Sequence, residues 1–286
     1  MKVLLAIDTS KTSHVVQMAA SRPWPADTMF CVISVIDMRH WEGLPALIED
    51  AKHEAESVVK RATNELAKTG HRVFSEIREG SPKEIITGQA KQWSADLVMV
   101  GSHGLGLATR FLLGSVAQAV LRTAPCSVEI VRKELPSRGA RILLATDGSE
   151  VSAKAVSEIA KRPWPEKSEV RIVSAVRLLT TDVPSLTSSF QTPMPNVVDE
   201  VTRLGKSRAE QAVAQARKAL TPSGLEISAA TPLGDPRPVI LDEAETWAAD
   251  LIVLGSHGLH GIDRFLLGSV AESVATHAAC SVEVVR

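Results

Sequence analysis

The chain carries one glycine-rich pattern twice, and this duplication restricts the folds open to it more than any other feature. Gly101-Ser-His-Gly104 is followed, after nine residues, by Gly114-Ser115. The same spacing recurs in Gly255-Ser-His-Gly258 and Gly268-Ser269. Each copy follows a short continuous apolar run and precedes apolar residues at helical spacing, which is typical of a strand, a turn and a helix. Each half of the chain therefore contains these three elements in the same order.

Other segments of the two halves repeat as well. The number of residues that separates the two copies of a feature is larger for the later features than for the earlier ones, so the second half carries an insertion. We assign this insertion to Thr180–Pro195, which is rich in Ser, Thr and Pro. Such a composition predicts a mobile loop, which we expect beside the ligand site of the second half. The repeated pairs are residues 2–10 and 141–149, 23–25 and 163–165, and 80–82 and 234–236.

Within each half, apolar strand segments alternate with helical segments. Alternation of this kind predicts a parallel sheet covered on both faces, with right-handed crossovers. The predicted fold class is therefore α/β, with two tandem Rossmann-like domains, each a five-stranded parallel sheet with helices on both faces. We expect the domains at 1–133 and 141–286, joined by a polar linker at 134–140. The strands of the first half are expected at 3–7, 29–36, 73–77, 97–100 and 127–131.

The last strand of each half would present an apolar edge if it were unpaired. Val128, Ile130 and Val131 form this edge in the first half, and residues 281–285 form it in the second. The simplest arrangement that removes both edges pairs the two strands across a pseudo-two-fold axis. We therefore expect the halves to form an intramolecular pseudo-dimer.

The glycine turns are candidate phosphate sites. Ligands of such sheets bind beyond the carboxyl ends of the strands, where Asp8, Gly80 and Gly101 are expected. Glycine lets the backbone approach an anion, and a helix N-terminus offers unpaired N–H groups. Ser115 and Ser269 stand where an N-cap would, so each either caps its helix or donates to a phosphate. The plainer alternative is that the glycines serve only a tight turn.

Composition argues against several classes of partner. The 286 residues carry a formal net charge of −1, which gives no electrostatic case for nucleic acid or an anionic membrane. The first apolar run is too short for a signal peptide, and no run reaches the length of a membrane span. Cys31, Cys126 and Cys280 are too few for a disulfide framework and are expected to be small buried residues in a reducing cytosol. We therefore expect a cytoplasmic protein without a metal site.

Several motifs together resemble those of the universal stress protein family. They are the repeated G-x2-G-x9-G-[ST] pattern, Asp147-Gly-Ser-Glu, the Gly-x-Pro turns, and Pro125-Cys-Ser-Val128, of which Cys126-Ser-Val recurs as Cys280-Ser-Val. The resemblance covers nearly the whole chain and implies a tandem member with a Rossmann-like fold of the adenine-nucleotide alpha hydrolase type. For the branch of the family that carries the glycine motif, it also implies ATP binding.

The resemblance gives each part of the site a role. Asp8 and Asp147 would lie near the adenine and ribose, and Val35 and Ala175 would face the adenine. The glycine turns would wrap the ribose and phosphates, and Gly114–Val116 with its copy would hold phosphate at the helix start. The complete set of candidate ATP-binding residues is Ala6, Asp8, Val35, Gly80, Val100, Gly101, Ser102, His103, Gly104, Gly114, Ser115, Val116, Ala145, Asp147, Ala175, Gly234, Leu254, Gly255, Ser256, His257, Gly258, Gly268, Ser269 and Val270.

Two departures from the family pattern distinguish the halves. Thr9 stands where the family has glycine, whereas the second half has Gly148. Ala175 is smaller than the usual valine, which the first half has at Val35. Both departures are expected to weaken binding modestly, so equal sites are not assumed. The need for Mg²⁺ stays open.

Some candidates have a plainer interpretation. Asp8 and Asp147 could be helix caps alone, because aspartate is a favoured N-cap. Trp24 and Trp164, each between two prolines, are expected to anchor packing rather than stack on a ligand. The residues that could either contact phosphate or ribose or simply face solvent are His103, His257, Arg110 and Arg264.

The sequence offers little for catalysis. Neither copy has the lysine of a P-loop, and Asp8 and Asp147 belong to different halves, so no carboxylate cluster suggests metal-assisted phosphoryl transfer. We expect a sensor or regulator whose conformation or association depends on ATP, with an unidentified regulatory protein partner. The alternatives are a non-catalytic interaction scaffold with empty sites, in which Thr180–Pro195 makes the contact, and a slow ATPase. Further homodimerisation stays open.

Overall fold

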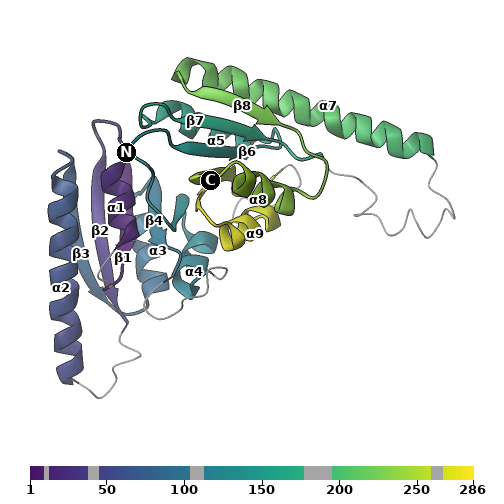
Figure 1. Ribbon diagram of the computed structural model, residues 1–286. Helices are drawn as coiled ribbons and strands as arrows, with labels where there is room; N and C mark the ends of the chain where they lie inside the picture. The colour runs from purple at the N-terminus through teal and green to yellow at the C-terminus, as the bar shows by residue number, and fades with distance from the viewer. Residues whose placement is uncertain (10–12, 38–44, 104–112, 177–194, 259–266) are drawn as a thin grey trace, which may run out of the picture.

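The computed structural model describes residues 1–9, 13–37, 45–103, 113–176, 195–258 and 267–286. Its strands form one sheet in the order β3-β2-β1-β4-β5-β10-β9-β6-β7-β8 (Figure 1). Neighbouring strands are parallel within each half, so the predicted fold class is confirmed. The strands are β1 Lys2–Ile7, β2 Met29–Ile36, β3 Arg72–Glu79, β4 Leu97–Gly101, β5 Ser127–Val131, β6 Arg141–Ala145, β7 Glu169–Val173, β8 Glu226–Ala230, β9 Leu251–Gly255 and β10 Ser281–Val285.

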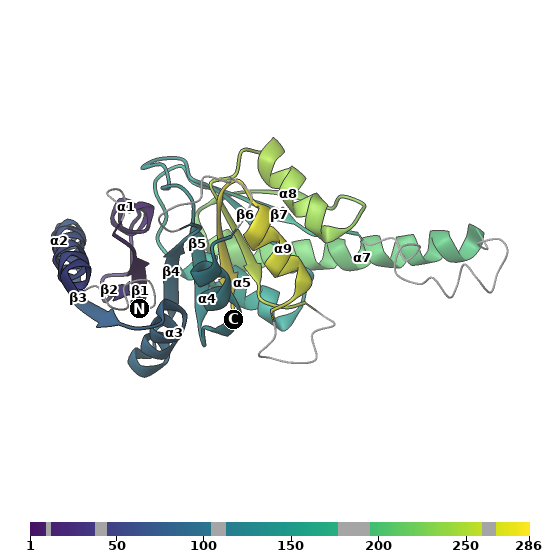
Figure 2. The same ribbon diagram turned by 90° about the horizontal axis from the view of Figure 1, so that it is seen from below.

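Helices cover both faces of the sheet. One apolar core lies between the sheet and α1, α2, α5 and α7, and a second lies between the opposite face and α3, α4, α8 and α9. Figures 1 and 2 both show α7 extending beyond the rest of the second half. The helices are α1 His14–Ser21, α2 Pro45–Ala67, α3 Pro82–Trp93, α4 Ser115–Thr123, α5 Glu150–Lys161, α7 Pro195–Leu220, α8 Pro236–Thr246 and α9 Ser269–His277, with a 3₁₀ turn, η3, at Thr221–Ser223.

The two halves meet where β5 and β10 pair antiparallel, as the edge argument predicts. Glu283 lies opposite Glu129 in this pair, and both side chains are fully buried. Arg162 donates two hydrogen bonds to Glu283, at 2.6 and 2.8 Å. Arg22 Nη2 lies 2.9 Å from Glu129 Oε2. The sequence did not predict this buried group of charges, because glutamate is rarely found in a protein interior.

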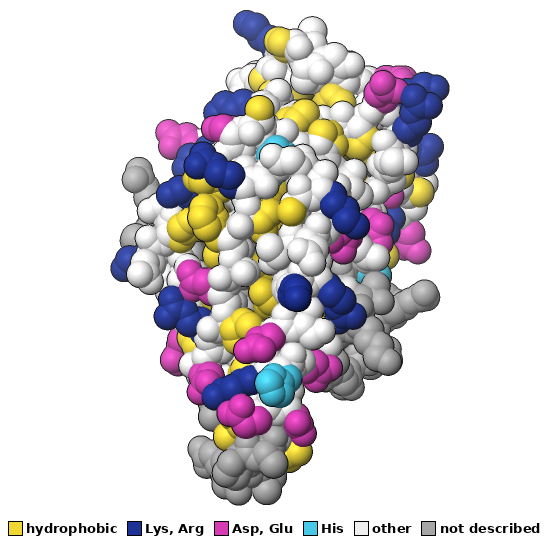
Figure 3. All heavy atoms as spheres, turned by 90° about the vertical axis from the view of Figure 1, so that its left-hand side faces the viewer, with side chains coloured by type: hydrophobic (Ala, Val, Ile, Leu, Met, Phe, Trp, Pro, Cys, Tyr) yellow, Lys and Arg dark blue, Asp and Glu magenta, His cyan; other side chains and the backbone are white. Residues whose placement is uncertain are grey.

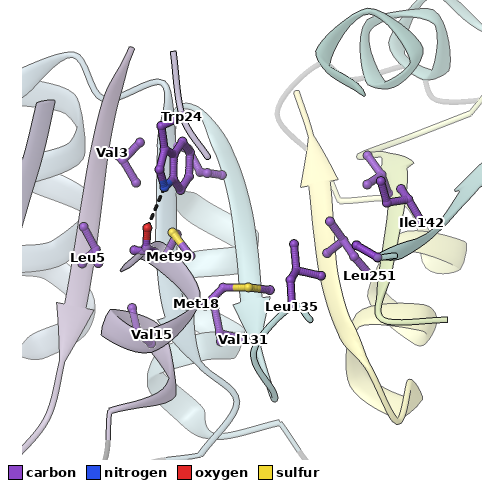
Figure 4. Packing of buried hydrophobic residues seen from close by; sticks show 14 of the residues in the cluster. Val3, Leu5, Val15, Met18, Trp24, Met99, Val131, Leu135, Ile142 and Leu251 are labelled. Atoms are coloured by element: carbon purple, nitrogen blue, oxygen red, sulfur yellow. Dashed lines mark hydrogen bonds between the residues drawn. The ribbon is translucent and has the colours of Figure 1, made fainter. Parts of the chain in front are cut away.

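Contacts on either side of this pair also join the halves. Arg132, which follows β5, donates to the carbonyl oxygen of Ala275 in α9 at 2.6 Å. Arg286, which follows β10, donates to the carbonyl oxygen of Leu121 in α4 at 2.8 Å. Each arginine thus places a positive charge near a helix C-terminus. Leu135 of the linker is buried in the core between the halves (Figure 4), so this part of the expected polar linker is a packing residue.

The two proline-flanked tryptophans anchor the core, which confirms the packing interpretation. Trp24 Nε1 donates to the carbonyl oxygen of Ala19 at 2.7 Å (Figure 4). Trp164 Nε1 donates to the carbonyl oxygen of Ile159 at 2.9 Å. Each tryptophan therefore ties the chain that leaves α1 or α5 back onto its own helix.

The surface and the thiols agree with the composition. Figure 3 looks onto the side of the molecule that carries α2 and shows basic and acidic side chains interspersed. No helix in the described parts of the chain is long and apolar enough to cross a membrane. Cys31 and Cys280 are buried, Cys126 is half-buried, and all three are free thiols.

Candidate functional site

A cavity of about 620 Å³ opens at the carboxyl ends of β6, β7 and β9 in the second half. Its volume falls within the usual range for small-molecule sites. The first turns of α8 and α9 and one side of α7 complete its walls. The predicted residues that line it are Ala145, Asp147, Ala175, Leu254, Gly255, His257, Gly258, Gly268, Ser269 and Val270.

Gly234 and Ser256 are the two predicted residues of the second half that do not line this cavity. Gly234 has φ +144°, and its N–H donates to the carbonyl oxygen of Val176 at 2.9 Å. Gly80 has φ +133°, and its N–H donates to Ile36 at 3.0 Å. Both positions require glycine for the turn before the next helix, so their role here is to shape the backbone.

The glycines around the cavity allow unusually close packing. A Cβ on Gly255 would lie 3.1 Å from the backbone of Val151 and Ser152 at the start of α5. A Cβ on Gly268 would lie 3.1 Å from the carbonyl oxygen of Ser256. A Cβ on Gly258 would collide with Oδ2 of Asp147. This close packing requires glycine at these positions and also brings their backbone to the cavity wall, where contact with a ligand stays a prediction.

Asp147 is not a helix cap. The N-cap of α5 is Ser149, whose side chain accepts from the N–H of Ser152, and the N-cap of α1 is Ser13 rather than Asp8. Asp147 Oδ1 instead accepts from the N–H of Ser149 at 3.0 Å. This short turn fixes the carboxylate at the end of β6, where it lines the cavity. The cap interpretation of Asp8 and Asp147 is therefore wrong.

The N-cap interpretation of Ser115 and Ser269 is also wrong. The N-caps of α4 and α9 are Gly114 and Gly268, neither of which makes a side-chain cap hydrogen bond. Each glycine takes the extended backbone of an N-cap, with ψ near 150°, so the serine becomes the first helical residue. The exposed serine hydroxyl therefore lies beside the N–H groups of the first turn, where an anion would bind.

The histidine of each glycine turn is held by the serine before it. Ser256 Oγ and His257 Nδ1 are 3.1 Å apart, and the corresponding atoms of Ser102 and His103 are also 3.1 Å apart. Ser256 is fully buried, which restricts the orientation of the imidazole. His257 lines the cavity, and its contact with a ligand stays a prediction.

The described part of the first half has the same framework. Ala6, Val100 and Gly101 lie at the carboxyl ends of β1 and β4, and Val35 lies near the end of β2. Gly114, Ser115 and Val116 begin α4 or precede it, and Asp8 follows β1 directly. The predicted residues Gly104, Arg110 and Arg264, and residues 180–194 of the assigned insertion, lie outside the described residues.

Sequence reasoning missed the wall formed by α7 and α8. The lining residues of α7 share one helical face, but their spacing in the sequence does not show that this face borders a cavity. Among the described residues, no group of three or more histidine, cysteine or acidic side chains could hold a metal ion. The further lining residues are Thr146, Ser152, Val173, Ser174, Val201, Leu204, Gly205, Arg208, Ala209, Pro236, Ile240 and Ala271.

The fold and the cavity define a tandem Rossmann-like α/β protein with a glycine-walled cavity at the carboxyl edge of its sheet. The chain belongs to the universal stress protein family, whose family model matches residues 1–132 and 140–286. The family identification made from the glycine motifs is therefore confirmed.

Relatives match at the level of one half or of the whole chain. Universal stress protein YxiE of Bacillus subtilis is 29% identical over 146 residues, which are 51% of this chain and 98% of that protein. A putative universal stress protein of Staphylococcus aureus strain USA300 is 33% identical over 146 residues, covering 47% of this chain and 86% of that protein.

Among solved structures, a universal stress protein from Archaeoglobus fulgidus matches 99% of this chain and 98% of its own, with a TM-score of 0.65 and 20% identity. A putative universal stress protein from Pseudomonas aeruginosa matches 99% and 92%, with a TM-score of 0.63 and 17% identity. At these identities the likeness shows the fold.

Proposed function

We propose that this protein is a cytoplasmic ATP-binding regulator of the stress response, with ATP controlling its conformation or its association with a partner protein. The observation that carries the proposal is the cavity of the second half. Its walls contain the glycines of the repeated motif, the carboxylate of Asp147 and the start of α9. These are the groups expected around the phosphates, ribose and base of a nucleotide.

The walls suit the separate parts of ATP. The N-terminus of α9, with Ser269 as its first residue, offers N–H groups and a partial positive charge to phosphate. The carboxylate of Asp147 can accept hydrogen bonds from ribose hydroxyls. Val173 and Ala175 give an apolar surface for adenine at the end of β7 and just beyond it. Mg²⁺, if it accompanies ATP, would be carried by the phosphates.

A regulator fits this site better than an ATPase. The ionisable side chains among the described lining residues are Asp147, Arg208 and His257. Asp147 already accepts from the N–H of Ser149 and lies against Gly258, which suits a binding role. An ATPase would instead show steady phosphate release well above that of a motif variant.

Nucleotide binding is tested first on the freshly purified protein, by denaturing it and identifying released small molecules by mass spectrometry. Calorimetric titration with ATP, with and without Mg²⁺, then gives affinity and stoichiometry. We expect Gly268→Glu to abolish ATP binding in the second half. A side chain at this position would approach Ser256 and His257 to about the shortest distance that side chains tolerate, so the turn would have to shift.

Gly88→Glu is the matched control. Gly88 is an exposed residue of α3, and a Cβ there would have no atom within 4 Å. The control introduces the same charge and should leave ATP binding unchanged. Absence of released nucleotide, together with no heat of ATP binding, would refute the proposal and favour the scaffold interpretation.

A further inference from the structure

One wall of the cavity carries a charge that the glycine motif does not contain. Val201, Leu204, Gly205 and Arg208 of α7 line the cavity at helical spacing, so they share one face of the helix. Arg208 is the only lysine or arginine among the described lining residues. It therefore supplies the permanent positive charge on this part of the site.

Arg208 is exposed at the cavity, and its guanidinium makes no ion pair or hydrogen bond with the described part of the chain. Other arginines of α7 are engaged. Arg203 forms an ion pair with Glu200 at 2.6 Å, and Arg217 donates to the carbonyl oxygen of Ile227 at 3.1 Å. The five donors of the Arg208 guanidinium are thus available to a ligand in the cavity.

The equivalent helix of the first half, α2, carries the opposite charge. The two helices align through their buried residues, and both are followed by a glycine with positive φ, Gly70 or Gly224. In this alignment Glu54 corresponds to Arg208 and Asp50 corresponds to Leu204. The buried pairs that fix the alignment are Ala55 with Ala209, Ala62 with Ala216, and Leu66 with Leu220.

We infer that Arg208 contacts the anionic part of the nucleotide in the second half, and that Asp50 and Glu54 make the first half unfavourable for the same polyphosphate. The inference rests on the proposed function and refines it, because it assigns the two halves ligands of different charge. An arginine beside phosphate forms charge-assisted, often bidentate hydrogen bonds. Carboxylates at the equivalent positions repel the same phosphates.

The test compares ligands that differ only in phosphate number. Calorimetry with adenosine, AMP, ADP and ATP is performed on the unaltered protein, Arg208→Ala, Arg208→Glu and Lys206→Glu. Lys206 is exposed on α7 and does not line the cavity, so Lys206→Glu makes the same change in net charge without touching the site.

We expect Arg208→Ala to weaken ATP binding by about tenfold, with smaller losses for ADP and AMP and no loss for adenosine. Arg208→Glu should weaken ATP binding further, and Lys206→Glu should stay within about twofold of the unaltered protein. The unaltered protein should bind about one ATP per chain tightly, and Asp50→Leu with Glu54→Arg should add a second tight site.

Each contrary result has a distinct meaning. If the unaltered protein binds ATP but Arg208→Ala binds it equally well, or loses adenosine and ATP alike, the inference is overturned and the proposed function stands. If two equally tight ATP sites exist before any change in α2, the assignment of different ligands is overturned. If the unaltered protein binds no nucleotide, both the proposed function and the inference fail.

Discussion

The buried ion pair between Arg162 and Glu283, which lies in the second half beside the β5–β10 junction, gives the sharpest test of how buried charge contributes to stability. The guanidinium donates two hydrogen bonds to the carboxylate, and both side chains are at most 6% exposed. Arg162→Leu leaves Glu283 without these bonds and opposite Glu129 across the β5–β10 pair. Removing one partner of a buried pair typically costs about 3–5 kcal/mol, so we expect a loss of that size.

The double variant separates the charge from the packing. Replacing a buried pair by apolar residues of similar volume is often neutral or stabilising. Arg162→Leu combined with Glu283→Leu should therefore recover most of the stability that the single change removes. Arg138→Leu is the control, because Arg138 and Glu166 are 69% and 74% exposed and such pairs contribute at most about 1 kcal/mol.

Urea unfolding, followed by circular dichroism, measures these differences as shifts of the midpoint at constant slope. The buried pair should shift the midpoint several times more than the exposed control. Equal shifts for Arg162→Leu and Arg138→Leu would refute the argument. A double variant no more stable than the single one would show that the arginine contributes through packing rather than through charge compensation.

Three further predictions follow from the same structure. Burial, opposed by Arg22, raises the pKa of Glu129. The contribution of this group to the free energy of unfolding is therefore full below about pH 4 and is lost as the pH rises through the raised pKa. Glu129→Gln should flatten this part of the curve of stability against pH, and parallel curves for the two proteins would contradict the prediction. Burial raises the pKa of each cysteine thiol to about 11, so a thiol reagent at neutral pH should label the folded protein slowly and the urea-unfolded protein at all three cysteines. Gly258→Ala should weaken ATP binding because its methyl group meets the Asp147 carboxylate, whereas Gly88→Ala, with open space around it, should not.

The sequence predicted the framework because each strand and helix has its own local signal. Segments rich in apolar residues predicted β2 and β5 with their observed bounds, and α3 begins at Pro82, where proline is favoured. β3 is longer than expected, since it pairs with β2 as far as Glu79. Arg78 and Glu79, which extend β3 beyond Ile77, are both charged and give no apolar signal of a strand.

Features that depend on distant segments could not be predicted in this way. The charge of Glu129 in β5 is compensated by Arg22, which follows α1. The two residues are far apart in the sequence, and no local pattern relates them. The N-cap at Gly268 depends on the close approach of Gly268 to Ser256 and His257. The α7 wall of the cavity was missed because a helical pattern shows which face is polar but not what that face covers.

The duplication has preserved some parts of the molecule more closely than others. Both halves retain the sheet order, the tryptophan anchors and a buried arginine–glutamate pair, all of which act through packing or through the junction. The turn after the first strand of each half has diverged. Gly148 has φ +79°, with Ala212 of α7 3.4 Å from where its Cβ would lie. Thr9 stands at the equivalent position, and the described non-glycine residues with positive φ are Ser94, Lys167 and Ala248.

Thr9 therefore takes a different backbone conformation from that of Gly148. A second difference lies on the helix that follows the second strand of each half, where Glu54 stands at the position equivalent to Arg208. Both changes lie at the carboxyl edge of the sheet, at positions that are not buried in the core. Because the strands fix the framework independently of these walls, one site can change its ligand while the other keeps it. Unequal occupancy of the two halves is thus the expected consequence of where the sequences have diverged.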